Sequence, residues 1–381
     1  MDSSATHCTL LHSGADYFPA LLAAIDAAQQ SIVLETYIFA DDATGRSVRN
    51  ALLAAAARGV AVRVTVDGFG SGAYARVLVA QLGAAGVVAR IYRPQRWWQA
   101  GLSPALLRRL HRKVCVIDAA LADSSPTGTA SRCAFVGGIN ILDDHNHYPH
   151  TDPTLGARFD YAVRLRGAVV ADVARLCDPL ASTNKESILA LWRKPVALFQ
   201  RDNLRHRNSI QKLYLKLLAS AQREVWIANA YFMPGRRFRR ALVSCAQRGV
   251  QVNLLLQGHQ EYLLQHHATR ALYGQMLAAG VRIFEYQASF LHAKVAVVDS
   301  ARATVGSSNI DPFSLLLARE ANVSVNQPAF ATELRAALLD ASTQHAIEVM
   351  PQTRPALWRR GLDWVAYGLL RLGVMVAVGR Y

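Results

Sequence analysis

The chain has 381 residues, of which 52% are hydrophobic, so it can bury a substantial core and is not disordered throughout. Its 42 basic and 27 acidic residues give a net charge of +15, which favours an anionic partner, either nucleic acid or a membrane surface. Five scattered cysteines without zinc-type spacing predict reduced thiols rather than disulfides. The sequence also lacks a pattern typical of a secretory signal and an apolar run of the length, about 18 residues, that predicts a membrane span.

The predicted elements, taken in chain order, occur twice. In the first half a helical pattern precedes an apolar strand, SIVLETYIF, and later segments read AAARGVAVRVTVDG, LGAAGVVARIY, HRKVCVID, FVGGIN and FDYAVRL. In the second half a helical pattern precedes EVWIANAYFM, and the matching segments are CAQRGVQVNLLLQG, MLAAGVRIFEY, HAKVAVVD, TVGSSN and REANVSV. Apolar strands alternating with helices, and ended by glycine, predict α/β sheets. The repeat therefore predicts two pseudo-symmetric α/β units that pack around a shared cleft.

We expect four segments on this basis. They are a first unit at 1–180, a linker at 181–208, a second unit at 209–343, and a basic, aromatic tail at 344–381.

HRKVCVID and HAKVAVVD carry the polar side chains whose spacing matters most. Residues i and i+2 of a strand face the same side, so His111 projects with Lys113, and His292 with Lys294. The small residues of GGIN and GSSN, which follow, let the backbone approach a ligand closely. A single His-x-Lys is usually an ordinary surface pair, but two long copies with matched flanks favour a shared site.

A site that joins two His, two Lys and two Asn suits a phosphate. Lysine and asparagine can hold the non-bridging oxygens. One neutral imidazole can attack phosphorus while the other, protonated, donates to the leaving oxygen. The pattern predicts phosphoryl transfer without a metal or other cofactor.

The paired motifs resemble the signature of the phospholipase D superfamily, from about Gly14 to about Asn326. GSSNIDPFSLLLAREANVSV is similar to bacterial cardiolipin synthases, and GGIN with FDYAVRLRG resembles their B type. The resemblance implies a phosphatidyl-histidine intermediate and the conversion of two phosphatidylglycerol molecules into cardiolipin and glycerol. It also implies a bacterial enzyme of phospholipid biosynthesis.

The resemblance implies roles for individual residues, although the near symmetry of the site does not rank the two histidines. His111 resembles the nucleophile and His292 the general acid and base. The implied catalytic set is His111, Lys113, Asp118, His292, Lys294 and Asp299, with Asp118 and Asp299 expected to tie down their strands rather than move protons. The implied phosphate contacts are Asn140, Asn309, Gly138 and Ser307. Glu320 and Asp160 are placed to orient the histidines, the alternative being acids at the exposed end of a strand.

Three segments outside the motifs leave alternatives open. Residues 143–152 are rich in metal-type ligands, but they lack zinc spacing and also fit a polar loop beside the site. Trp97 and Trp98, between arginines, fit either a bilayer interface or a packed helix. The tail after Arg354, interrupted by Asp363 and Arg371, fits an interfacial helix, or a helix docked on the protein.

We expect peripheral attachment to the cytoplasmic face of an anionic cell membrane, with phosphatidylglycerol as substrate and no nucleic-acid partner. The sequence makes no prediction about the oligomeric state. The rival functions are another phosphatidyltransferase or a hydrolase of the same superfamily, a nuclease, and a non-catalytic binding protein. The aromatic tail disfavours a nuclease, and two intact motifs disfavour a non-catalytic protein.

Overall fold

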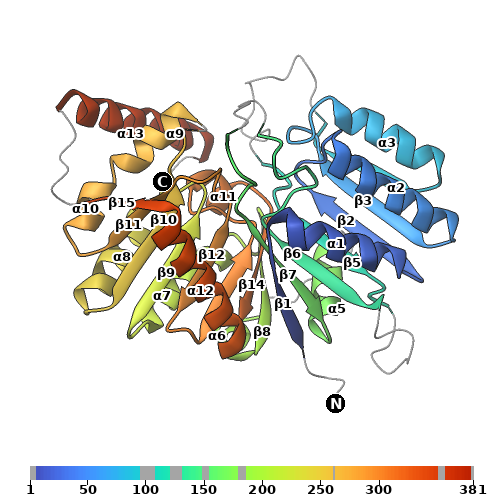
Figure 1. The fold of residues 1–381 in the computed structure, drawn as a ribbon, viewed down its shortest axis with the longest axis horizontal. Coiled ribbons are helices and arrows are strands. Elements are labelled where there is room, and N and C mark those ends of the chain that lie inside the picture. Colours follow the sequence, from blue (N-terminus) through green and yellow to red (C-terminus); the bar gives the residue numbers. More distant parts are fainter. Residues whose placement is uncertain are drawn as a thin grey trace.

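The computed structural model describes residues 6–94, 108–120, 131–147, 154–178, 186–260, 262–350 and 357–378. Two α/β units lie side by side, the first in blue and green and the second in yellow to red (Figure 1). Each unit is built on one sheet with helices against it, as the alternation of helical and strand patterns predicts.

The first sheet has the strand order β1-β7-β6-β5-β2-β3-β4 within the described ranges. Strands β2, β3 and β4 are parallel, whereas β5, β6, β7 and β1 continue the sheet in antiparallel pairs. Its strands are β1 (His7–His12), β2 (Ser31–Thr36), β3 (Ala61–Asp67), β4 (Val88–Tyr92), β5 (Lys113–Ile117), β6 (Cys133–Gly137) and β7 (Tyr161–Arg166).

The second sheet repeats this order and adds one strand, giving β15-β11-β10-β9-β12-β13-β14-β8 in the part of the chain that the structure describes. Its strands are β8 (Val196–Arg201), β9 (Glu224–Asn229), β10 (Gln251–Gln257), β11 (Arg282–Tyr286), β12 (Lys294–Val298), β13 (Arg302–Gly306), β14 (Glu320–Val325) and β15 (Ala346–Glu348). Strands β9, β12 and β13 thus correspond to β2, β5 and β6. The predicted duplication is confirmed, and with it the fold class.

Helices cover the sheets in corresponding places, such as α1 and α7 before the strands β2 and β9. In the first unit they are α1 (Ser13–Asp26), α2 (Ala43–Ala57), α3 (Tyr74–Ala84) and α5 (Val169–Cys177). Later in the chain they are α6 (Ile188–Arg193), α7 (Ser209–Ser220), α8 (Arg236–Gln247), α9 (Leu263–Arg270), α10 (Tyr273–Leu277), α11 (Pro312–Leu316), α12 (Pro328–Gln344) and α13 (Leu357–Val378). Both α2 and α8 are followed by a glycine at positive φ, Gly59 at 87° and Gly249 at 84°, as the repeated Arg-Gly-Val predicts.

The central core lies between the two sheets. It joins side chains of β5, β6 and β7 to side chains of β12, β13 and β14, with α5 and α12 contributing at its margins. All five residues of β5 and of β12 are buried, which explains why both strands read as unbroken apolar runs. A separate core lies under the helices of each unit. The strands that carry the motifs are therefore held on both faces.

The boundaries of the second unit differ from those expected. The segment 181–208, expected to be a linker, contains α6 and β8, and β8 pairs with β14 along its full length. The position of β8 matches that of β1, which pairs with β7 in the first unit. Residues 346–348, expected in the tail, form β15 and pair with β11. Comparing the two halves of the sequence did not predict either strand, because both lie outside the repeated motifs.

The end of each motif strand is fixed by an aspartate. The carboxylate of Asp118 accepts hydrogen bonds of 2.8–2.9 Å from the backbone N–H groups of residues 29–31. Asp299 repeats the arrangement with residues 222–224 at 2.8–3.0 Å. Both aspartates have positive φ, 52° and 53°, which aspartate tolerates better than most residues. Burial alone would raise the pKa of Asp118, but these donors help to hold it below its usual value.

We predict that Asp118→Ala and Asp299→Ala each lower the free energy of unfolding by about 1–3 kcal/mol, because three backbone donors lose a charged acceptor. Urea unfolding at neutral pH measures the loss. The difference from the unchanged protein should shrink as the pH falls through the lowered pKa of Asp118. Asp41, an exposed acid, is the matched control, and Asp41→Ala should change stability by less than about 0.5 kcal/mol. Equal stability of all three variants would contradict the structural role.

Candidate active site

Each motif histidine is paired with a carboxylate of the opposite unit. Nδ1 of His111 lies 2.9 Å from Oε1 of Glu320, and Nδ1 of His292 lies 2.6 Å from Oδ2 of Asp160. Both carboxylates are buried, and the imidazoles are only 14% and 9% exposed. An ionised carboxylate only accepts hydrogen bonds, so each Nδ1 carries the proton and each Nε2 is left unprotonated for chemistry.

Backbone contacts between the units hold both pairs in register. Leu110 forms an isolated bridge with Arg319, and Phe159 forms one with Leu291. The N–H of His111 donates to the Arg319 carbonyl at 3.0 Å, and the N–H of His292 donates to the Phe159 carbonyl at 2.8 Å. Each bridge therefore lies one residue before a histidine on one chain segment and before its carboxylate on the other.

The two carboxylates differ in the direction of their pKa shift. Burial lowers the pKa of both histidines, that of His292 well below its usual value, so both are neutral near pH 7. Burial also raises the pKa of Asp160 to about 6. Glu320 is equally buried, yet the neighbouring His111 and Lys113 and its hydrogen bonds bring its pKa below the usual value. The two copies are thus alike in geometry and unlike in the pKa of their carboxylates.

The two lysines lie beside the histidines as the strand spacing predicts. Nζ of Lys113 donates to the backbone carbonyl of His111 at 2.7 Å, and Nζ of Lys294 donates to that of His292. Both side chains are buried, and burial lowers the pKa of Lys113 to about 7. Two ammonium groups in one enclosed site repel each other, so each makes protonation of the other less favourable. An anionic ligand would reduce this repulsion.

Asn140 and Asn309, at the ends of GGIN and GSSN, are both buried. Oδ1 of Asn140 accepts a hydrogen bond from the Ile38 N–H at 3.1 Å. Oδ1 of Asn309 has no hydrogen-bond partner within the described residues. The second amide therefore keeps an unused acceptor inside the site.

Gly138 and Ser307, which we expected to contact phosphate, each lie against a carboxylate. Their contact with phosphate stays a prediction. The hydroxyl of Ser307 donates to Oε2 of Glu320 and accepts from the Ala321 N–H at 3.1 Å. A Cβ atom on Gly138 would lie 2.2 Å from Oδ1 of Asp160, so no side chain fits there without moving that carboxylate.

Asp118 and Asp299 do not join the histidines. Each follows a five-residue strand whose other end carries the motif lysine, so about 16 Å of strand separates them from it. The motif pattern grouped them with the catalytic residues, but their carboxylates are used by the backbone contacts described above. Their place in the motif reflects folding rather than chemistry.

Sequence comparison missed an aromatic residue at the site. The ring of Tyr37 lies 4.9 Å from that of His111, and Nζ of Lys113 lies 5.3 Å from the centre of the Tyr37 ring. Aligning SIVLETYIF with EVWIANAYFM places Ala230 opposite Tyr37, so the second copy has no equivalent. This difference between the two copies was visible in the sequence and could have indicated that Tyr37 belongs to the site.

The metal-type ligands of 143–152 serve as loop anchors where they are described. Oδ2 of Asp144 accepts from the Gly14 N–H at 2.6 Å, and Oδ1 of Asp143 accepts from the His145 N–H at 2.9 Å. Residues 148–152 lie outside the described part of the chain, as do Trp97 and Trp98. Within the described residues, no three His, Cys, Asp or Glu side chains gather in a way that would hold a metal ion.

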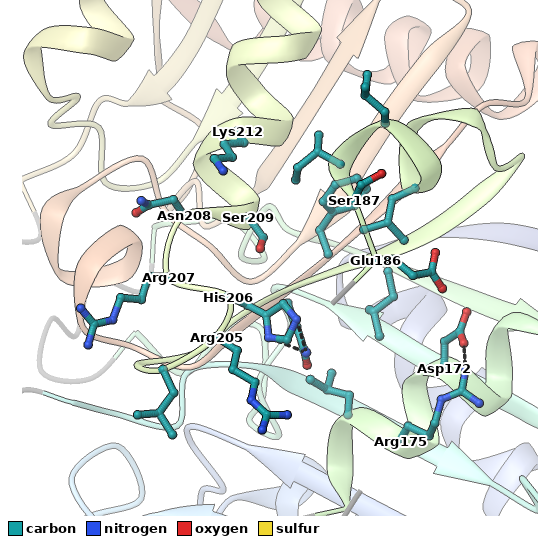
Figure 2. A pocket seen from close by; sticks show the side chains of 18 residues that line it. Asp172, Arg175, Glu186, Ser187, Arg205, His206, Arg207, Asn208, Ser209 and Lys212 are labelled. Atoms are coloured by element: carbon teal, nitrogen blue, oxygen red, sulfur yellow. Dashed lines mark hydrogen bonds and ion pairs between the residues drawn. The ribbon is translucent and has the colours of Figure 1, made fainter. Parts of the chain in front are cut away.

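A cavity of about 960 Å³ lies elsewhere, between α5, α6, β8 and α7 (Figure 2). Its charged lining includes both signs, such as Arg205 and Arg207 and the ion pair of Arg175 with Asp172. None of the motif residues lines it, so the chemistry does not belong to this cavity.

The comparisons with known proteins agree with this geometry. The family model described as "Cardiolipin synthase, PLD-like domain" matches residues 21–148 and 214–340. Cardiolipin synthase B of Shigella flexneri and that of Escherichia coli K12 are each 40% identical over 95% of this chain and 87% of their own length. Phosphatidylserine synthase of Haemophilus influenzae has a similar fold, with a TM-score of 0.69 at 14% identity over 97% of this chain and 94% of that one. Two matched domains, two motif copies and close relatives along nearly the whole length lead to one conclusion: the chain belongs to the phospholipase D-like cardiolipin synthase family.

Proposed function

We propose that this protein is a cardiolipin synthase that transfers a phosphatidyl group from one phosphatidylglycerol to another and releases glycerol. The observation that carries the proposal is the crossed pairing of two buried histidines with carboxylates of the opposite unit. Such a pairing leaves two Nε2 atoms for chemistry, one for attack and one for proton transfer. The relatives at 40% identity are named cardiolipin synthases, which supports phosphatidylglycerol as the substrate class.

In the first step, Nε2 of His111 attacks phosphorus and a P–N bond forms. The bond from phosphorus to the glycerol oxygen breaks, and that oxygen takes a proton from Nε2 of His292, which the anionic substrate keeps protonated in the complex. In the second step, the terminal hydroxyl of another phosphatidylglycerol gives its proton to His292 and attacks phosphorus. The P–N bond then breaks, which returns both histidines to their starting states.

The assignment of His111 as nucleophile is supported by the difference between its carboxylate partner and that of His292. Attack on phosphorus makes the imidazole cationic, so the nucleophile benefits from a partner that stays ionised. Ser307 donates a hydroxyl hydrogen bond to Glu320, the partner of His111, whereas Gly138 has no hydroxyl to donate to Asp160, which accepts from the Tyr161 N–H at 2.8 Å. The raised pKa of Asp160, about 6, suits a pair that exchanges protons near neutral pH.

We propose that Lys113, Lys294, Asn140 and Asn309 hold the non-bridging oxygens of the phosphate. A phosphodiester carries one negative charge, which compensates the repulsion between two buried ammonium groups. Binding of the anionic substrate therefore raises the pKa of Lys113 from about 7 and keeps the lysine charged.

We also propose peripheral attachment to the cytoplasmic face of the membrane, with residues 344–381 as the membrane-associating segment. The described helices include none with the length and apolarity needed to cross a bilayer. The net charge of +15 favours an anionic surface. A hydrolase of the same family is the second candidate, because water could replace the second lipid in the final step, and its product would be phosphatidic acid.

We predict that His111→Ala and His292→Ala each reduce cardiolipin synthesis by roughly 10³-fold or more. A phosphatidyl ester of 4-nitrophenol separates their roles, because this leaving group needs no proton. His292→Ala should still release one burst of nitrophenol per enzyme, and His111→Ala should release none.

Labelled phosphatidylglycerol, with cardiolipin and phosphatidic acid resolved as products, distinguishes transferase from hydrolase. Near-normal synthesis by either variant would contradict the two-histidine mechanism. A burst from His111→Ala alone would reverse the assignment of the nucleophile.

We predict that Ser307→Ala moves the acid limb of the pH–rate profile upward by about one pH unit. The variant removes a donor from ionised Glu320, so the pKa of Glu320 rises and the carboxylate is lost at a higher pH. Ser308→Ala is the matched control, since the Ser308 hydroxyl contacts the Asn309 carbonyl rather than a carboxylate. An acid limb that stays in place in Ser307→Ala would argue against this role.

We predict that EDTA leaves the rate of synthesis unchanged within about twofold, since lysine and asparagine supply the phosphate contacts. Dialysis against EDTA followed by the labelled-lipid assay tests this. Loss of activity that a single divalent cation restores would instead point to the loop at 143–152.

A further inference from the structure

Helix α13 is apolar on two sides but packs on only one. Its inward residues are spaced by three or four, as a helix face requires: Asp363, Ala366, Tyr367 and Leu370. Oδ1 of Asp363 lies 2.7 Å from Nδ1 of His267 on α9, and the Tyr367 hydroxyl accepts from Arg239 on α8 at 3.3 Å. The helix lies along α9 at the upper edge of the second unit (Figure 1). The docked arrangement is therefore the one that the structure adopts.

The outward side of α13 carries a second apolar stripe. Leu362, Val365, Leu369 and Leu372 are 48–60% exposed and share one face of the helix, while Trp364, beside them, is 55% exposed. On α9, Leu263 and Leu264 are also exposed, at 63% and 42%. Exposed apolar side chains gathered on two packed helices are typical of a binding site.

Helix α8, which contacts α13 through Arg239 and Tyr367, adds positive charge at this end of the second unit. Arg236, Arg237 and Arg240 are exposed, and no hydrogen bond or ion pair within the described residues holds them. Two of them stand in the first turn of the helix, where the helix dipole favours anions and disfavours cations. Arginines in an unfavourable position, without a hydrogen bond or ion pair inside the protein, suggest that an anion outside the protein binds them.

The surface also lies at the same end of the second unit as the active site. The N–H of Met233, three residues before α8, donates to the Ile310 carbonyl next to Asn309 at 2.8 Å. The ring of Tyr262, immediately before α9, lies 5.9 Å from that of Tyr231. Helix α13 itself contacts α11, which begins three residues after Asn309.

We infer that the outward faces of α13 and α9, together with the α8 arginines, form one docking surface for an anionic phospholipid bilayer. The inference deepens the proposed function, because it places the plane of the substrate membrane beside the catalytic histidines. Leucine, valine and tryptophan enter the headgroup region, and the arginines meet lipid phosphates. Docking in this orientation brings phosphatidylglycerol to the site without withdrawing the whole lipid into water.

A bilayer fits this surface better than a second copy of the chain. Burying the apolar stripe between two copies related by a twofold axis would bring the same unpaired arginines toward each other. An anionic bilayer can bind both features at once, because its phosphates attract the arginines and its apolar interior buries the stripe. The exposed Trp364 adds a side chain that favours the bilayer interface.

Flotation of the full chain with phosphatidylglycerol vesicles across a salt series tests the inference. Val365→Asp with Leu369→Asp should weaken binding about tenfold or more at all salt concentrations, because apolar burial is not screened. Arg236→Ser, Arg237→Ser and Arg240→Ser together should weaken binding about 100-fold at low salt and little at high salt.

Two matched controls lie at the opposite edge of the second unit, around the 960 Å³ cavity. Leu189→Asp with Leu204→Asp changes residues that are 60% and 82% exposed, and Arg205→Ser with Arg207→Ser removes two positive charges, against three in the docking variant. Both controls should float like the unchanged protein. Transfer between short-chain phosphatidylglycerol molecules below their micellar concentration, which needs no docking, reports whether each variant is folded.

Unchanged flotation of both docking variants would overturn the inference. So would a change from dimer to monomer in sedimentation, caused by the α13 variant without any loss of flotation, since it would show that a second copy covers the stripe. Failure of the proposed function gives a different result: the unchanged protein would float but form no cardiolipin from either substrate.

Discussion

The exchange of carboxylates between the two units is the constraint on which the rest of the site depends. A buried imidazole without a partner would be free to choose either tautomer, and neither Nε2 atom would be reserved for chemistry. Glu320 and Asp160 settle the tautomer from across the interface. The contacts between the sheets therefore do more than stabilise the fold, since sliding one unit by a single residue would remove both partners.

The two copies of the motif have kept their geometry and lost their equivalence. Ser307 stands where the first copy has Gly138, and Tyr37 stands where the second copy has Ala230. These two differences place a hydroxyl on one carboxylate and an aromatic ring against one histidine. A reaction in two steps needs a group that bonds to phosphorus and another that only carries a proton. The duplicated fold holds both histidine–carboxylate pairs in the same backbone geometry. A few side-chain differences give the two pairs different surroundings.

The sequence predicted the duplication and the fold class because these depend on patterns that repeat within the chain, and the same patterns are the basis for the predicted site residues. Spacing of two along a strand is enough to place His111 beside Lys113. It did not predict that the carboxylates cross between units, since two pseudo-symmetric halves permit pairing within a copy or between copies. It also did not predict that Ser307 donates to Glu320, because the residue type alone does not show whether a hydroxyl contacts a ligand or a carboxylate. Strand β8 was missed because one strand outside the motifs carries too little pattern to be told from a linker.

Each sheet is closed by strands of its own half, β1 against β7 and β8 against β14. The two halves thus have separate sheets but share a core and a site, because each contributes a histidine whose orienting acid belongs to the other. An ancestor consisting of a single copy would have had to work as a homodimer, with two equivalent half-sites. Joining two such copies in one chain would remove the requirement for equivalence. Each half could then change alone, so that a division of roles between nucleophile and proton carrier, as proposed above, could be inherited.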